Sequence, residues 1–120
     1  MNIMIVDDEP QVAEVLAKSL SRQGHRTTVV HSGEEALKAI GNAPPDALFL
    51  DVSMPGINGL EVLAEVRRTR PQLAVVVITG NATAEQVEEV KRLGAVDVIP
   101  KPAALNHYHA AIERLHPRNV

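Results

Sequence analysis

Three adjacent acidic residues, Asp7, Asp8 and Glu9, follow directly after an apolar run at residues 3–6. Carboxylates this close together repel one another, and they resist losing water beside an apolar core. A hard divalent cation such as Mg²⁺ offsets that repulsion, because it prefers oxygen ligands and often binds a substrate phosphate as well. The pattern therefore predicts that positive charge binds where the first apolar run ends.

Three further side chains with useful chemistry, Asp51, Thr79 and Lys101, stand at the ends of later apolar runs. A phosphoryl group bound beside the acidic residues would meet Asp51 as a nucleophile, while Lys101 and Thr79 would stabilise its oxygens by charge and hydrogen bonding. Each residue alone has a simpler explanation: Asp8 or Glu9 caps a helix, Asp51 forms a turn, and the other two are a strand-end hydroxyl and a solvated charge. Their shared position favours one common site.

Five short runs rich in Val, Ile and Leu predict strands at residues 3–6, 27–30, 47–50, 73–78 and 96–99. Segments of helical length separate these runs. Strict alternation of strand and helix with short connections predicts an α/β fold with a doubly wound parallel sheet and right-handed crossovers. In such sheets ligands bind beyond the carboxyl ends of the strands, which is where the reactive side chains fall.

The first predicted helix spans residues 10–24 and places Val12, Val15, Leu16 and Leu20 on one buried face. The spacing of Ser32 and Glu35, and that of Thr83 and Gln86, is typical of a capping box at the start of a helix.

The remaining helix ends are predicted from single residues. Gly41 and Gly94 stand where the second and fourth helices are expected to end, and Asn58 is expected to cap the third helix. The last helix carries an apolar stripe that includes Tyr108, which we therefore expect in the core.

The composition indicates one domain, residues 1–120, because 120 residues with 45% apolar content suffice for a single core. A formal net charge of -3 gives no general attraction to nucleic acid or to an anionic membrane. Arg67, Arg68 and Arg70 are explained by the negative end of the third helix rather than by a nucleic-acid patch. The chain has no Cys and no apolar run of membrane-spanning length, so we expect a soluble protein that suits a reducing cytoplasm.

The motifs IVDDE, LDVSMPGINGLEVL, VVVITG and GAVDVIPKP occur in an order and spacing that resemble the receiver domain of bacterial two-component response regulators. The resemblance covers essentially the whole chain. It implies a flavodoxin-like strand order of 2-1-3-4-5 and a phosphoryl group accepted on Asp51. It also implies that Mg²⁺ is held by Asp7, Asp8, Asp51 and the main-chain carbonyl of Ser53.

The same resemblance implies roles for other residues and for partners. Thr79 and Lys101 would contact the phosphoryl group, and a cis bond would precede Pro102. The phosphoryl donor would be a phosphohistidine of a sensor histidine kinase or of a phosphotransfer protein. The output would pass to a downstream protein target or to an effector domain that this chain lacks, without direct contact to nucleic acid or membrane.

Two residues bear on the alternative functions. Val98 stands where receiver domains often have Tyr or Phe, which leaves open an inert docking module that does not switch. Ser53 stands where a small phosphatase with an aspartyl intermediate usually has a second acid, so that function is disfavoured. A flavodoxin-like cofactor binder is also disfavoured, because the acidic residues after the first strand would repel a phosphate unless a metal intervened.

Overall fold

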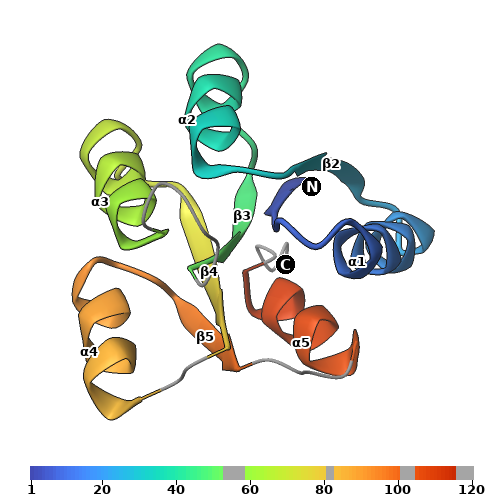
Figure 1. Cartoon of the computed structure of the whole chain (residues 1–120). Coiled ribbons are helices and arrows are strands. Elements are labelled where there is room, and N and C mark those ends of the chain that lie inside the picture. The colour runs from blue at the N-terminus through green and yellow to red at the C-terminus, as the bar shows by residue number, and fades with distance from the viewer. Residues whose placement is uncertain (53–58, 81–82, 101–104, 116–120) are drawn as a thin grey trace, which may run out of the picture.

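Five parallel strands form a single sheet in the order β2-β1-β3-β4-β5 (Figure 1). The computed structural model describes residues 1–52, 59–80, 83–100 and 105–115. The strands are β1 (Asn2–Val6), β2 (Arg26–Val30), β3 (Ala47–Asp51), β4 (Ala74–Thr79) and β5 (Asp97–Pro100). The doubly wound parallel sheet and its order are therefore confirmed, and each strand lies within one residue of its predicted bounds. Pro100 falls in an edge strand, where a residue without an amide donor is tolerated.

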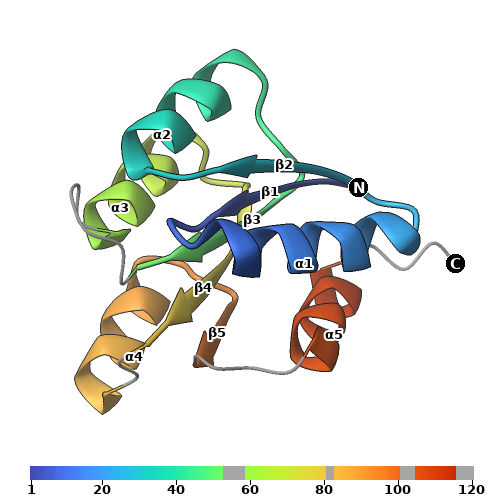
Figure 2. The ribbon, with the colours of Figure 1, turned by 45° about the vertical axis from the view of Figure 1, so that its right-hand side comes forward.

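Helices cover both faces of the sheet (Figures 1 and 2). They are α1 (Pro10–Arg22), α2 (Gly33–Asn42), α3 (Gly59–Thr69), α4 (Ala84–Arg92) and α5 (Leu105–Leu115). The buried residues divide into two clusters, one beneath α2, α3 and α4 and the other beneath α1 and α5. Within the described residues, no helix combines the length and apolar character that a bilayer crossing requires.

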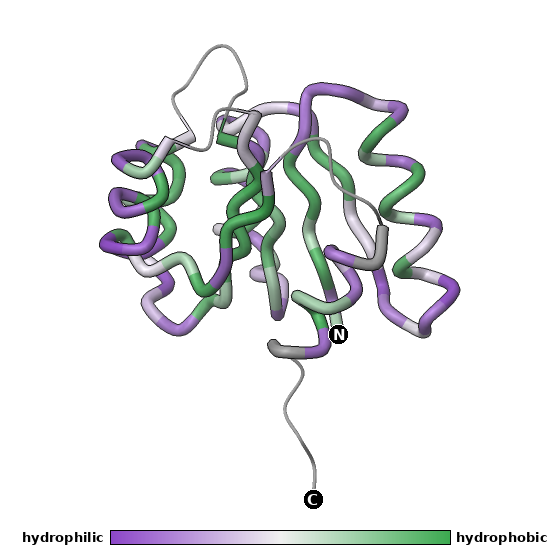
Figure 3. The backbone as a smooth tube through the Cα atoms, turned by 90° about the horizontal axis from the view of Figure 1, so that it is seen from below, coloured by the Kyte–Doolittle hydropathy of each residue, from purple (hydrophilic) through white to green (hydrophobic). Residues whose placement is uncertain are grey.

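The strands carry apolar residues on both sides, because successive side chains of a strand point to opposite faces. In β3, Leu48 and Leu50 pack in the cluster beneath α2, α3 and α4, whereas Phe49 packs beneath α5. Figure 3 shows the strands as hydrophobic segments enclosed by helices of mixed character. Full burial of a Leu or Phe side chain contributes about 1.5–3 kcal/mol relative to exposure. Burial on both faces thus holds the central strands in place, and with them the residues at their carboxyl ends.

Helix α1 presents a different face to the sheet from the one predicted. Its buried residues are Ala13, Leu16 and Leu20. Val12 and Val15, expected in the core, are 39% and 54% exposed. The prediction was wrong because the stripe that faces the sheet runs through Ala13, Leu16 and Leu20, at positions i, i+3 and i+7, and Val12 and Val15 lie to one side of it.

The start of α2 and the ends of α1, α2 and α4 test the predicted helix boundaries. Ser32 accepts a hydrogen bond on its Oγ from the amide of Glu35, at 3.1 Å, as the capping box predicts. Gly24 and Gly94 have φ angles of 92° and 90° after α1 and α4, a conformation that glycine adopts without strain. Gly41 was predicted to end α2 but lies inside its last turn, since the helix continues to Asn42. Asn58 lies outside the described residues.

The end of α4 is held by Arg67, which comes from the last turn of α3. Its guanidinium donates to the carbonyls of Leu93 at 3.3 Å, Gly94 at 3.0 Å and Pro71 at 2.8 Å. A Cβ atom on Gly94 would lie 2.6 Å from Nε of Arg67, so glycine also makes room for this contact. Arg67 therefore does more than complement the α3 dipole, because it ties α4 to the segment that leads into β4.

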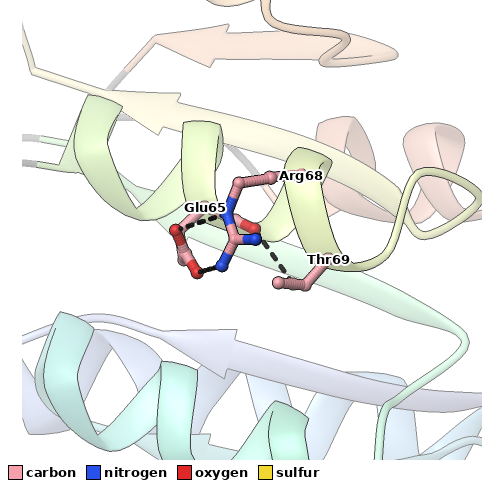
Figure 4. Close-up of polar contacts among 3 residues, drawn as sticks. All are labelled: Glu65, Arg68 and Thr69. Carbon is pink, nitrogen blue, oxygen red and sulfur yellow. Dashed lines mark hydrogen bonds and ion pairs between the residues drawn. The ribbon is translucent and has the colours of Figure 1, made fainter.

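An exposed ion pair lies on α3, between Glu65 and Arg68 (Figure 4). Arg68 donates through Nε to Oε1 of Glu65 at 3.1 Å, and Thr69 donates through Oγ1 to the main-chain carbonyl of Glu65 at 2.9 Å. The hydrogen bond from Arg68 lowers the pKa of Glu65 below its ordinary value of 4.5 and raises the pKa of Arg68. Water screens such a pair, so we expect it to contribute little to stability.

Candidate functional site

The site lies at the carboxyl edge of the sheet, where β1, β3 and β4 end side by side. Val6 pairs with Leu50, so the register places Asp7 beside Asp51. Asp51 is itself the last residue of β3. Because parallel strands end at the same edge, the two acids come together from positions far apart in the sequence.

Four carboxylates meet at this edge: those of Asp7, Asp8, Glu9 and Asp51, which we call the acidic cluster. One oxygen from each residue lies within 4.8 Å of one oxygen from every other. Asp7 and Asp51 are each 1% exposed, whereas Asp8 and Glu9 are exposed. Opposite oxygen ligands of Mg²⁺ lie about 4 Å apart, so this spacing and this all-oxygen donor set fit one hard cation.

Asp7 organises the loop between β1 and α1. Its amide donates to the carbonyl of Val30 at 3.1 Å, and its Oδ1 accepts from the amide of Glu9 at 2.9 Å. Glu9 occupies the N-cap position of α1, but its side chain makes no capping hydrogen bond. Simple helix capping by Glu9 therefore does not explain the run of acidic residues.

The chain directly after Asp51 is also held in place. The amide of Val52 donates to the carbonyl of Ile78 in β4, at 2.9 Å. A Cβ atom on Gly59, the first residue of α3, would lie 2.3 Å from Cα of Val52, so only glycine fits there. The backbone that carries Asp51 is thus fixed by β4 on one side and by α3 on the other.

The predicted phosphoryl contacts are described in part. Thr79 is the last residue of β4 and is 4% exposed. Since Asp51 pairs with Ile78, Thr79 stands one residue beyond the partner of Asp51 at the same edge. Lys101, Ser53 and the bond before Pro102 lie outside the described residues, so their roles stay predictions.

Val98 and Tyr108 lie on opposite sides of the sheet. Val98 pairs with Val77 and is partly buried against the cluster beneath α2, α3 and α4. Tyr108 is buried beneath α5 with its ring 5.7 Å from that of Phe49, in an edge-to-face arrangement at 76°. The prediction that Tyr108 is a core residue is confirmed, and its position does not allow it to replace an aromatic ring at Val98.

Glu9 was predicted as one of the three adjacent acids but not as a metal ligand, and its carboxylate belongs to the acidic cluster. One residue near the site was not singled out by the sequence. His31 places Nδ1 3.1 Å from the carbonyl oxygen of Asp7. No spacing rule reveals this contact, because it joins the ends of β1 and β2.

The chain is similar in sequence to response regulators. The family described as the response regulator receiver domain matches residues 3–113. The response regulator MprA of Mycobacterium avium (strain 104) is 40% identical over 115 residues. That match covers 96% of this chain and 50% of MprA, so the chain spans half the length of this curated relative.

Solved structures agree with this similarity. The receiver domain of NtrX from Brucella abortus has 35% sequence identity and a TM-score of 0.88, and the match covers 94% of this chain and 96% of that one. A CheY-like response regulator receiver domain protein from Methanospirillum hungatei JF-1 has 26% identity and a TM-score of 0.90, over 95% and 92% of the two chains. Sequence, strand order and overall structure thus agree, and the chain belongs to the response regulator receiver domains, the signalling modules of two-component systems.

Proposed function

We propose that residues 1–120 act as a phosphoacceptor receiver domain, which takes a phosphoryl group on Asp51 and thereby changes a surface that a partner reads. The observation that carries the proposal is the acidic cluster, with the buried Asp51 at the end of a central strand and three more carboxylates around it. Stability alone does not favour such a group of like charges. A site for a cation and a phosphoryl group does favour it.

Asp51 is the proposed nucleophile. One of its carboxylate oxygens forms a bond to phosphorus while the bond between phosphorus and a donor imidazole breaks, and the imidazole nitrogen keeps that electron pair. The donor is a phosphohistidine of a sensor histidine kinase or of a phosphotransfer protein. The product is an acyl phosphate on Asp51.

The remaining site residues bind and orient. Asp7, Asp8, Asp51 and the main-chain carbonyl of Ser53 would hold Mg²⁺, which neutralises carboxylate and phosphoryl oxygens when bound. Thr79 would donate its hydroxyl to a phosphoryl oxygen, and the ammonium of Lys101 would pair with another. Support for the metal ligands comes from the oxygen spacing in the cluster, and support for Thr79 comes from its buried place beside Asp51.

The proposed output is a contact with protein. Phosphorylation would bias the β4–α4 region between two states through local charge, and a downstream target or an effector domain would read the difference. The match covers half of MprA, and the other half leaves room for a further domain in that relative. The proposal places the protein in the cytoplasm and involves no direct contact with nucleic acid or membrane.

A phosphorylation assay with mass detection tests this proposal. The protein is incubated with Mg²⁺ and a small phosphodonor such as acetyl phosphate, and its intact mass is measured. We expect one added phosphoryl group in the wild type, none in Asp51→Asn, and none when EDTA removes the metal. Asp46→Asn is the matched control, because Asp46 precedes the same strand at the opposite edge. A wild type that stays unmodified by acetyl phosphate and by a phosphohistidine donor would overturn the proposal.

A second candidate, an inert docking module, is favoured by Val98, because no aromatic ring occupies that position. The two candidates differ in what beryllofluoride, a phosphoryl mimic, does in the presence of Mg²⁺. A switching receiver shows changed amide NMR shifts in α4 and α5. An inert module shows changes confined to the acidic cluster and its loops.

A further inference from the structure

An exposed histidine outside the acidic cluster contacts the backbone of one of its members. His31 follows β2 directly, and its Nδ1 lies 3.1 Å from the main-chain carbonyl oxygen of Asp7. A carbonyl oxygen only accepts hydrogen bonds, so Nδ1 carries the proton and donates it. The second ring nitrogen, Nε2, takes no part in this hydrogen bond.

The imidazole is mounted on a short and well-fixed piece of chain. On one side, the carbonyl of Val30 accepts the amide of Asp7 at 3.1 Å. On the other side, Ser32 is the N-cap of α2 and accepts the amide of Glu35 on its Oγ. His31 is the only residue between these two anchored positions, so its main chain has little freedom to move.

The contact completes the support of Asp7. Its amide and its carbonyl are both bonded to the end of β2, and its Oδ1 is bonded to the amide of Glu9. The carbonyl of Asp7 is part of the peptide bond that links Asp7 to Asp8. A donor on that carbonyl therefore fixes both the buried carboxylate of Asp7 and the direction in which the chain leaves toward the exposed one.

We propose that His31 is a positioning residue for metal binding, acting through the carbonyl of Asp7 to keep the carboxylates of Asp7 and Asp8 in place for Mg²⁺. This inference rests on the proposed function, which assigns the metal to those residues. Hydrogen bonds that orient metal ligands from outside the ligand set commonly raise metal affinity, because they remove alternative orientations of the ligands.

Two substitutions separate the hydrogen bond from the rest of the side chain. His31→Ala removes the donor. His31→Asn keeps it, because the amide nitrogen of Asn occupies nearly the place of the imidazole Nδ1. His107→Ala is the matched control, since His107 is an exposed histidine on α5. For each variant, the Mg²⁺ dissociation constant is measured by calorimetry, and urea unfolding is measured in EDTA.

We expect His31→Ala to weaken Mg²⁺ binding by about 3–10-fold, and His31→Asn and His107→Ala to stay within about twofold of the wild type. We also expect His31→Ala to lose more free energy of Mg²⁺ binding than free energy of unfolding in EDTA. A merely structural role would not produce this difference. If the wild type binds Mg²⁺ and His31→Ala binds it equally well, or if Asn fails to rescue, the positioning role is overturned and the proposed function stands. If the wild type binds no Mg²⁺, both proposals fail.

Discussion

The two edges of the sheet carry charge in different arrangements. At the carboxyl edge, oxygens of four carboxylates lie within 4.8 Å of one another, and two of these side chains are buried. At the amino edge, before β4 and β5 begin, the guanidinium of Arg67 donates to the carbonyls of Pro71, Leu93 and Gly94. The first arrangement gathers like charges, while the second pairs a cation with the partial negative charges of carbonyl groups.

This difference separates residues that stabilise the fold from residues that prepare it for a ligand. Arg67 satisfies groups that the folded chain itself presents, so its contribution is available without any other molecule. The acidic cluster instead gathers like charges, and a bound cation relieves their repulsion. The comparison therefore predicts opposite signs for substitutions at the two edges when no metal is present.

Substitution at the amino edge should have the largest effect on stability. We expect Arg67→Met to lower the free energy of unfolding by about 2 kcal/mol, because hydrogen bonds from a charged donor contribute about 1.5–3 kcal/mol and these are partly exposed. Urea denaturation measures the change. Arg92→Met, which removes an exposed ion pair with Glu89 on α4, should stay within about 0.5 kcal/mol of the wild type. Equal losses in the two variants would contradict a special role for Arg67.

Substitution at the carboxyl edge should have the opposite sign and a smaller size. We expect Asp7→Asn to raise the free energy of unfolding in EDTA by about 1 kcal/mol, which is the repulsion between two charges at this spacing even in water. The side-chain oxygen of Asn can still accept the amide of Glu9. Thermal unfolding with and without Mg²⁺ should then show stabilisation by the metal in the wild type and in Asp46→Asn, but not in Asp7→Asn. A loss of stability in EDTA would place Asp7 with the residues that stabilise the fold.

The ion pair of Glu65 and Arg68 should show the smallest effect, and only a pH dependence reveals it. The folded protein has a lowered pKa at Glu65, so the stabilisation is present above the ordinary value of 4.5 and is lost as the pH falls through the lowered pKa. Chemical denaturation of the wild type and of Arg68→Met should therefore differ slightly near pH 7 and converge in acid. A difference that grows in acid would have the wrong sign.

The sequence predicted the sheet well because its signals are local. Apolar runs such as residues 73–78 marked strands, and the capping box at Ser32 marked the start of α2. The strand order came from the family resemblance. The buried face of α1 was mispredicted, because a count of large apolar side chains chose Val12 and Val15 although the buried stripe runs through the smaller Ala13.

The acidic cluster was predicted because strand ends converge at one edge of a parallel sheet, which brings Asp51 to Asp7 without any local signal. The contacts that hold the cluster were not predicted. His31 contacts Asp7 although 24 residues separate them in the sequence, and Arg67 contacts Gly94 although 27 residues separate them. Contacts of this kind depend on side-chain direction after folding, which neither periodicity nor spacing encodes.

The aromatic pair beneath α5 gives the molecule a natural optical probe. The chain has one Tyr, one Phe and no Trp, so near-ultraviolet absorption and emission arise chiefly from the phenol of Tyr108. That ring rests edge-on against Phe49, two residues before Asp51 in the strand that ends in the acidic cluster. The near-ultraviolet circular dichroism of Tyr108 therefore reports on how α5 packs on its side of the sheet, and the opposite side contributes almost no chromophore.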